Sequence, residues 1–109
     1  NKINDANKSS ANQTASAIAN SVQSEIVSII SGVSSPDNKY VKGTNGVVDG
    51  LKDGITSGTQ FEDGKAKIKL TYTATSGATH GTITVDVEVS GQPSPTYTVD
   101  IVDGKVTQA

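Results

Sequence analysis

Along the first thirty positions, apolar residues recur at spacings that keep them on one face of a helix. This stripe consists of Ile3, Ala11, Ala15, Ile18, Val22, Ile26 and Ile29. Ser, Asn, Gln and Ala surround it, and no charged residue stands between Lys8 and Glu25. The pattern predicts one helix over residues 1–30 that begins without an N-cap signal. Such a helix would be roughly 45 Å long, longer than a domain of this size needs, so we expect it to continue a longer helix.

A stop signal and a glycine-rich stretch follow the predicted helix. Gly32 can occupy the C′ position, and Ser35-Pro36 then prevents continuation of the helix. Four apolar residues of the next stretch could share one side of a short helix: Val47, Val48, Leu51 and Ile55. Glycines interleave them, and each glycine weakens a helix by about 1 kcal/mol relative to alanine. We therefore predict a packed connecting loop over residues 31–60, with one helical turn at most.

Three later segments alternate strictly between apolar and polar residues, which is the period of a half-buried strand. They span residues 65–74, 82–89 and 96–102. The predicted inward residues are Ala66, Ile68, Leu70, Tyr72, Ala74, Ile83, Val85, Val87, Val89, Tyr97, Val99 and Ile101. Lys, Thr and acidic residues dominate the alternate positions, so one face of the predicted antiparallel sheet is solvated. Pro93 and Pro95 mark the connection before the third segment.

Two Asp-Gly pairs predict tight hairpin turns, and the first is Asp63-Gly64. A two-residue loop at this pair places Glu62 opposite Lys65 on the solvated face. The same loop places Phe61 opposite Ala66 on the apolar face. Turn chemistry and alternation therefore agree on one register for this hairpin.

The second predicted turn is Asp103-Gly104. The same rule places Ile101 opposite Val106, both inward, and Asp100 opposite Thr107 on the solvated face. A slip of one residue would turn either strand inside out. We predict type I′ geometry, with positive φ at the glycine of both turns.

Together these patterns predict an α+β fold in a single domain over residues 1–109. A long N-terminal helix packs on one face of a four- to five-stranded antiparallel sheet, which occupies residues 61–108. The hairpins add strands near 58–62 and 105–108. We expect the helix from Ala15 to Ile29 to cover the inner sheet face, and the preceding half of the helix to project.

Composition narrows the class of function. Nine Lys against eleven acidic residues give a formal net charge of −2, which offers no electrostatic reason to bind nucleic acid or an anionic membrane. The chain has no cysteine, so it has neither a disulfide framework nor a thiolate metal site. Aromatic residues are 4% of the chain, so the predicted core is aliphatic and no base-stacking platform is predicted.

Candidate chemical groups are few, and each has a plainer structural interpretation. His80 is the only histidine, and we interpret it as a surface residue of a turn over residues 75–81. The Asp-Gly pairs could suggest calcium, but no EF-hand spacing occurs and Asp-Gly is a common turn sequence. No acid, base and nucleophile combine in the sequence. We therefore predict no enzyme, no catalytic or cofactor-binding residue, no cofactor and no metal ligand.

Two other patterns also have structural interpretations. Asn7-Lys8-Ser9 and Asn12-Gln13-Thr14 match the glycosylation sequon, but both lie on the predicted helix, so we interpret them as chance matches. The solvated face places lysines beside acidic residues of the next strand: Lys65, Lys67, Lys69, Asp86 and Glu88. We interpret these as cross-strand pairs, with an isopeptide crosslink as the alternative.

The helix sequence from Asn4 to Glu25, NDANKSSANQTASAIANSVQSE, resembles the second half of the long helix of type IV pilins and pseudopilins. In that family, Ala, Asn and small polar residues lead into a stretch similar to Ile-Ala-Asn-Ser-Val before a connecting loop. The order of helix, loop and antiparallel sheet is also similar over the whole chain. The resemblance implies a very hydrophobic half-helix upstream of Asn1. Because the cysteine pair of many pilins is absent, it also implies a disulfide-free branch, as in Gram-positive bacteria.

The resemblance implies a structural subunit of a type IV pilus filament, located outside the cell on its surface and used for attachment or motility. Its partners would be other pilin subunits, bound through the upstream helix, which would also hold the precursor in the cytoplasmic membrane. We expect residues 1–109 on their own to be monomeric and not to bind nucleic acid. The alternative is a minor pilin, or a pseudopilin for DNA uptake or secretion, that acts as a binding module.

Overall fold

One long helix and an antiparallel sheet make up most of the structure, a computed structural model that describes residues 1–31, 40–44, 47–51, 58–74 and 81–109. In chain order the elements are α1 (Lys2–Ile30), β1 (Val41–Thr44), β2 (Val47–Leu51), β3 (Gln60–Asp63), β4 (Ala66–Ala74), β5 (Gly81–Val89), β6 (Gln92–Pro93), β7 (Tyr97–Asp100) and β8 (Val106–Gln108). The predicted α+β class, with an N-terminal helix packed on one face of an antiparallel sheet, is confirmed.

The Asn1 side chain bonds a backbone N–H in the first turn of α1 that the described residues show. Asn1 Oδ1 accepts a hydrogen bond from the backbone N–H of Asn4 at 3.0 Å. The N–H of Asp5 donates to the Asn1 carbonyl at 2.9 Å. Asparagine is a favourable N-cap because its side chain satisfies a helix N–H that has no partner within the helix. The predicted C-terminal cap, Gly32, lies outside the described residues.

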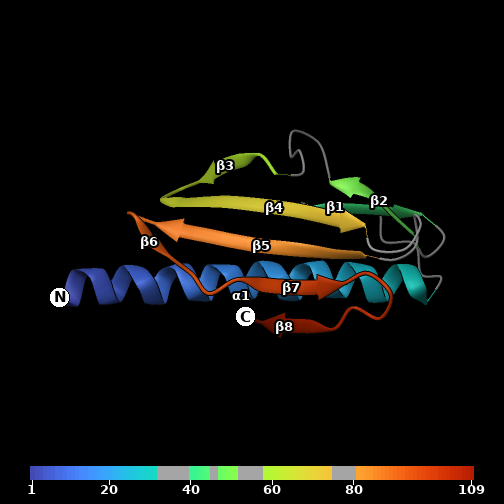
Figure 1. Ribbon diagram of the computed structural model, residues 1–109, viewed down its shortest axis with the longest axis horizontal. Coiled ribbons are helices and arrows are strands. Elements are labelled where there is room, and N and C mark those ends of the chain that lie inside the picture. Colours follow the sequence, from blue (N-terminus) through green and yellow to red (C-terminus); the bar gives the residue numbers. More distant parts are fainter. Residues whose placement is uncertain (32–39, 45–46, 52–57, 75–80) are drawn as a thin grey trace.

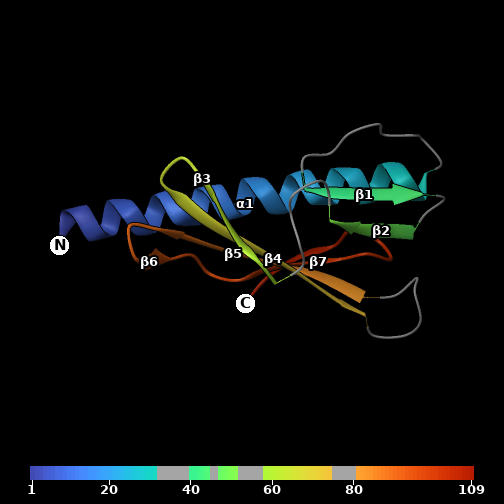
Figure 2. The same ribbon diagram turned by 90° about the horizontal axis from the view of Figure 1, so that it is seen from above.

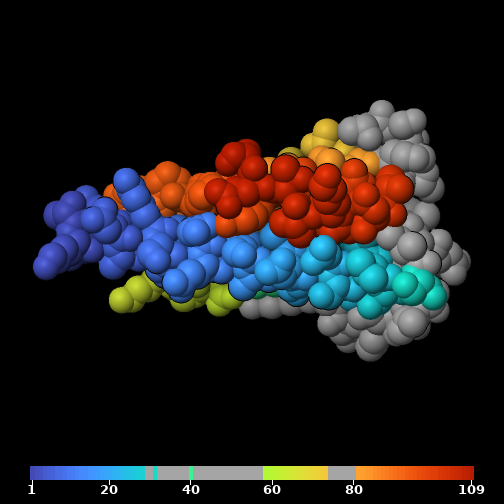
Figure 3. All heavy atoms as spheres, turned by 90° about the horizontal axis from the view of Figure 1, so that it is seen from below, coloured from blue at the N-terminus to red at the C-terminus, as the bar shows by residue number. Residues whose placement is uncertain are grey.

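The central strands of the main sheet cover one face of α1, and its two edge strands lie beside the helix. Its strands follow the order β3-β4-β5-β7-β8, all antiparallel, and the short β6 also pairs with β5. In Figure 1 the central strands β4 and β5 lie above the helix, and Figure 2 shows that they cross it obliquely. The two edge strands, β3 and β8, lie on opposite sides of α1 (Figure 3). The face of the helix that is turned toward the viewer in Figure 3 stays uncovered between them.

The loop predicted over residues 31–60 contains a hairpin, so that prediction is wrong. Strands β1 and β2 pair antiparallel, with Thr44 opposite Val47 and a bulge between Lys42 and Gly43. The sequence between the strands is Asn45-Gly46, the dipeptide that most strongly favours a two-residue hairpin. The helical interpretation of residues 47–51 is therefore excluded, and Ile55 lies outside the described residues.

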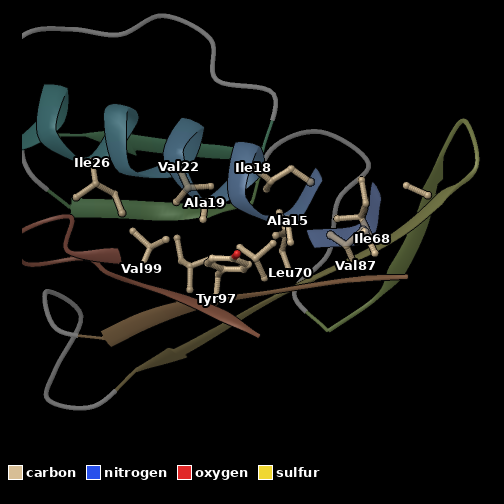
Figure 4. Packing of buried hydrophobic residues seen from close by; sticks show 14 of the residues in the cluster. Ala15, Ile18, Ala19, Val22, Ile26, Ile68, Leu70, Val87, Tyr97 and Val99 are labelled. Carbon is tan, nitrogen blue, oxygen red and sulfur yellow. The ribbon is translucent and has the colours of Figure 1, made fainter. Parts of the chain in front are cut away.

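Aliphatic side chains from α1 and from the inner sheet face form the core. The helix contributes Ala11, Ala15, Ile18, Ala19, Val22 and Ile26. The strands β4, β5 and β7 contribute Ala66, Ile68, Leu70, Ile83, Val85, Val87, Val89, Tyr97 and Val99. Figure 4 shows members of the two sets pointing toward each other. The predicted helix stripe is thus confirmed from Ala11 to Ile26, whereas Ile3 is 72% exposed and the side chain of Ile29 is not described.

The β3–β4 hairpin differs from its predicted register by two residues. Asp63 lies opposite Ala66 and Phe61 opposite Ile68, whereas the prediction placed Phe61 opposite Ala66. Gly64 has the predicted positive φ, +63°. It is the only residue of its two-residue loop with positive φ, which is the pattern of a type II′ turn rather than type I′. Because the shift is two residues, both strands keep their predicted faces.

The β7–β8 hairpin is shifted by two residues as well. Val99, not Ile101, lies opposite Val106. The N–H of Gly104 donates to the carbonyl of Asp100 at 2.8 Å and closes a loop over residues 101–104. Gly104 has φ +75°, as predicted, and Ile101 stays buried although it belongs to the turn.

Substitution of Val22 tests the packing of α1. Val22 is fully buried, so Val22→Asp places an unpaired carboxylate in an aliphatic core and should cost several kcal/mol of unfolding free energy. Asn20→Asp is the matched control, because Asn20 is exposed on the same helix and should shift stability by less than about 0.5 kcal/mol. Equal midpoints of the two variants in chemical denaturation would contradict this packing.

A comparison of Gly64 with Gly104 tests the turns. Both glycines have positive φ, so alanine at either position should cost about 1–2 kcal/mol. A Cβ at Gly104 would also lie 3.1 Å from Val27 Cγ2, whereas a Cβ at Gly64 meets no atom within 4 Å. Gly104→Ala should therefore lower the thermal midpoint more than Gly64→Ala. The reverse order would show that the contact between the β7–β8 loop and α1 is not tight.

Candidate functional site

The described residues contain no candidate metal centre. No group of three His, Cys, Asp or Glu side chains in the ranges described gathers closely enough to hold a metal ion. His80 lies outside those ranges, as do residues 75–80 of its predicted 75–81 turn, whereas Gly81 begins β5. Asp103 Oδ1 accepts a hydrogen bond from the Lys105 N–H at 2.8 Å, so this carboxylate stabilises its own turn. The surfaces of α1 and of the sheet are therefore the remaining candidates for a functional site.

Residues 1–10, at the start of α1, form a surface that the described part of the sheet leaves open. All of them are exposed except Asn7, which is half-buried, and the first buried residue is Ala11. In Figures 1 and 3 this end of the helix extends past the sheet. Ile3 presents an exposed aliphatic side chain there. The expected projection is therefore present but shorter than predicted, because burial begins at Ala11 rather than at Ala15.

The last contacts between the sheet and this exposed end come from the segment 93–95 and from Tyr97. The Tyr97 hydroxyl donates a hydrogen bond to Asn12 Oδ1. A shallow groove of about 500 Å³ lies beside this contact, lined by Lys8, Ser9, Asn12, Pro93, Ser94 and Pro95. The sequence indicated the two prolines only as a connection between strands. Their position across this groove from the helix could not be foreseen from strand periodicity.

Side-chain hydrogen bonds bridge the interruption between β6 and β7. The Ser94 N–H donates to the Val87 carbonyl at 2.7 Å, and the Val87 N–H donates to Ser94 Oγ at 3.2 Å. The Ser94 hydroxyl in turn donates to the Pro95 carbonyl at 2.8 Å. Thr96 Oγ1 donates to Asp86 Oδ1 at 2.8 Å. Residues 94–96 therefore stay bonded to this edge of β5 although two prolines interrupt the partner strand.

A second groove lies where Tyr40 meets the helix. It has a volume of about 420 Å³ and is lined by Gln13, Thr14, Ala17, Ile18, Ser21 and Tyr40. The Tyr40 and Phe61 rings contact each other with centroids 6.4 Å apart, which links the start of β1 to the edge strand β3. Like the first groove, this one is open to solvent and contains no cluster of acid, base and nucleophile among the described side chains.

The outer face of the sheet is organised in rungs that cross the strands. The first two rungs are Glu62, Lys67, Glu88 and Pro93, then Gln60, Lys69 and Asp86. The third rung is Thr71, Thr84, Thr98 and Thr107, one threonine on each of four strands. The prediction that lysines lie beside acidic residues of the next strand is confirmed for two of them, since Lys67 lies opposite Glu88 and Lys69 opposite Asp86. Lys65 lies in the β3–β4 turn instead, so Glu62 faces Lys67.

Three further observations concern α1. Both sequons lie on the helix, as predicted, with Asn7 half-buried and Asn12 bonded to Tyr97. Glu25 is buried, 4% exposed, which the apolar stripe did not predict. The helix is also not hydrophobic enough over its length to qualify as a membrane span, and no other helix occurs in the residues described.

Comparison with known proteins adds no relative. A scan against models of protein families, a search of curated proteins and a search of solved structures each found no match to this chain.

A double-mutant cycle tests the bond that joins the sheet to the exposed end of α1. Tyr97→Phe removes the donor and should lower the unfolding free energy by about 1 kcal/mol. Asn12→Ala removes the acceptor, and the double variant should cost less than the sum of the two single changes. Strict additivity in urea denaturation would show that the hydrogen bond contributes nothing to stability.

Proposed function

We propose that this protein is a structural subunit of a type IV pilus filament on the cell surface. The observation that supports the proposal best is the division of α1 into a part buried under the sheet and an exposed first part that extends past it. An exposed aliphatic residue, Ile3, lies on that first part. The resemblance of residues 4–25 to the pilin helix points to the same arrangement.

In this proposal the exposed part of α1 continues an apolar half-helix that anchors the precursor in the cytoplasmic membrane. About 20 apolar residues are needed to span a bilayer. After processing, the same half-helix packs with those of other subunits in the filament core. The sheet, including residues 65–108, then faces outward, and the 31–60 region lies near neighbouring subunits. The assembled fibre would serve attachment or motility.

Deletion of the gene from its host tests the proposal directly. Loss of surface pili, observed by electron microscopy and restored by the gene in trans, is the expected result for a major subunit. Pili of normal number and length would contradict that role and favour the minor-pilin or pseudopilin alternative. An upstream coding sequence without an apolar helix would contradict the pilin proposal altogether.

A matched pair of point variants tests which surface acts in assembly. Ile3 and Val102 are both exposed, at 72% and 49%, so lysine at either should change folding stability by less than about 0.5 kcal/mol. Ile3→Lys should reduce filament number strongly, because a charge would enter a helix-packed core. Val102→Lys, on the outward side, should leave filaments unchanged. Equal numbers of filaments in the two strains would contradict a role for the exposed end of α1.

A further inference from the structure

The outer face of the sheet carries two short columns of opposite charge, which we call the charged patch: Lys67 and Lys69 on β4, Asp86 and Glu88 on β5. Strand register places Lys67 beside Glu88 and Lys69 beside Asp86. In the described ranges no ion pair joins the two columns, and the hydrogen bond to Asp86 comes from Thr96. The charges of the patch therefore remain available to a partner, although they cancel in sum.

The arrangement is complementary to itself. A two-fold axis that runs along the strands, between β4 and β5, would bring β4 of one copy over β5 of the other. Lys67 of each copy would then face Glu88, and Lys69 would face Asp86. At the next rung Thr71 would face Thr84, and on the flank Glu62 would face Pro93, so no like charges meet. We infer that the charged patch docks against the same patch of a second copy of this chain, as an isologous contact.

The direction of the strands fits a contact between parallel fibres. Strands β4 and β5 run lengthwise over α1, although obliquely (Figures 1 and 2). Rotation about an axis along them keeps the N-terminal ends of both helices at the same end of the pair. Two filaments of equal polarity, lying side by side, present their subunits in this way. The inference in this form rests on the proposed function.

The contact is weak between single domains and strong only when repeated. The lysines of the patch are exposed and the acids half-buried, so each ion pair across the contact stays partly hydrated and contributes little. A fibre repeats the patch along its length, and repeated weak contacts between two fibres add into high avidity. The charged patch therefore joins fibres without making the isolated domain a stable dimer.

Beads coated densely with the domain test the contact without any filament. A flexible Gly/Ser linker of roughly 80 residues joins Asn1 to the bead, and its ends lie about 50 Å apart on average. This exceeds the 46 Å length of the domain, so domains on neighbouring beads can turn and pair with their N-terminal ends on the same side. Wild-type beads should clump at about 20 mM salt and disperse at about 500 mM, where the Debye length falls below the size of the patch. Wild-type beads that stay dispersed at low salt would overturn the inference. The gene-deletion test of the filament would be unaffected by that result.

Charge exchange tests the pairing. Lys67→Glu with Lys69→Glu makes every charge of the patch negative, and Asp86→Lys with Glu88→Lys makes every charge positive. Beads with either double variant alone should stay dispersed, and a mixture of the two kinds should clump at least tenfold faster than either. Thermal unfolding of both variants verifies that they fold. No clumping of the mixture, with both variants folded, would overturn the inference.

Cysteine crosslinking tests the geometry with the native charges, since the chain contains no cysteine. A short bismaleimide should join Thr71→Cys beads to Thr84→Cys beads, because these positions face each other across the axis. Thr107→Cys is the control, with the same residue type on the same rung but on the edge strand β8. Crosslinking of Thr107→Cys at a tenfold lower rate is expected, and equal rates would overturn the two-fold arrangement.

Discussion

Burial of one aliphatic face of α1 under the inner face of the sheet is the interaction on which the rest of the structure depends. Alanines at 11, 15 and 19 are fully buried, so small side chains line much of the contact on the helix side. The close approach of Gly104 to Val27 continues this tight packing at the far end of the helix. With 4% aromatic residues, the domain depends on many small aliphatic contacts rather than a few large ones. Where this contact ends, near Ala11, the helix continues without the sheet.

The periodicity of the sequence is enough to predict the faces of the strands but not their register. Alternation has a period of two, so pairing Phe61 with Ala66 or with Ile68 leaves the same residues inside. The residues of the turn decide between these registers. Asp-Gly favours the two central positions of a type I′ turn, but in neither hairpin does the pair form a two-residue loop. The type I′ pattern, with two successive positive φ values, occurs instead at Ser90-Gly91. A prediction based on helix propensity missed the β1–β2 hairpin, although the sequence Asn45-Gly46 favours a hairpin.

The surfaces of α1 and of the outer sheet face combine residues that are distant in sequence, so little of them could be predicted. The helix stripe predicts that the first part of α1 projects, since its apolar residues thin out before Ala11. The bond from Tyr97 to Asn12 depends on tertiary packing, and so does the groove that Pro93 and Pro95 form with the helix. The charged rungs are predictable in part, because alternation puts lysines and acids on one face, but their alignment needs the observed register.

The central claim is that α1 has a part held by its own sheet and a first part that is reserved for neighbouring subunits. Amide hydrogen exchange of residues 5–10, compared between the isolated domain and purified fibres, tests it most directly. These amides should exchange fast in the domain, where the described part of the chain leaves them exposed, while those around Val22 approach the protection of global unfolding. In fibres, residues 5–10 should become strongly protected. The same fast exchange of residues 5–10 in fibres as in the domain would contradict the claim.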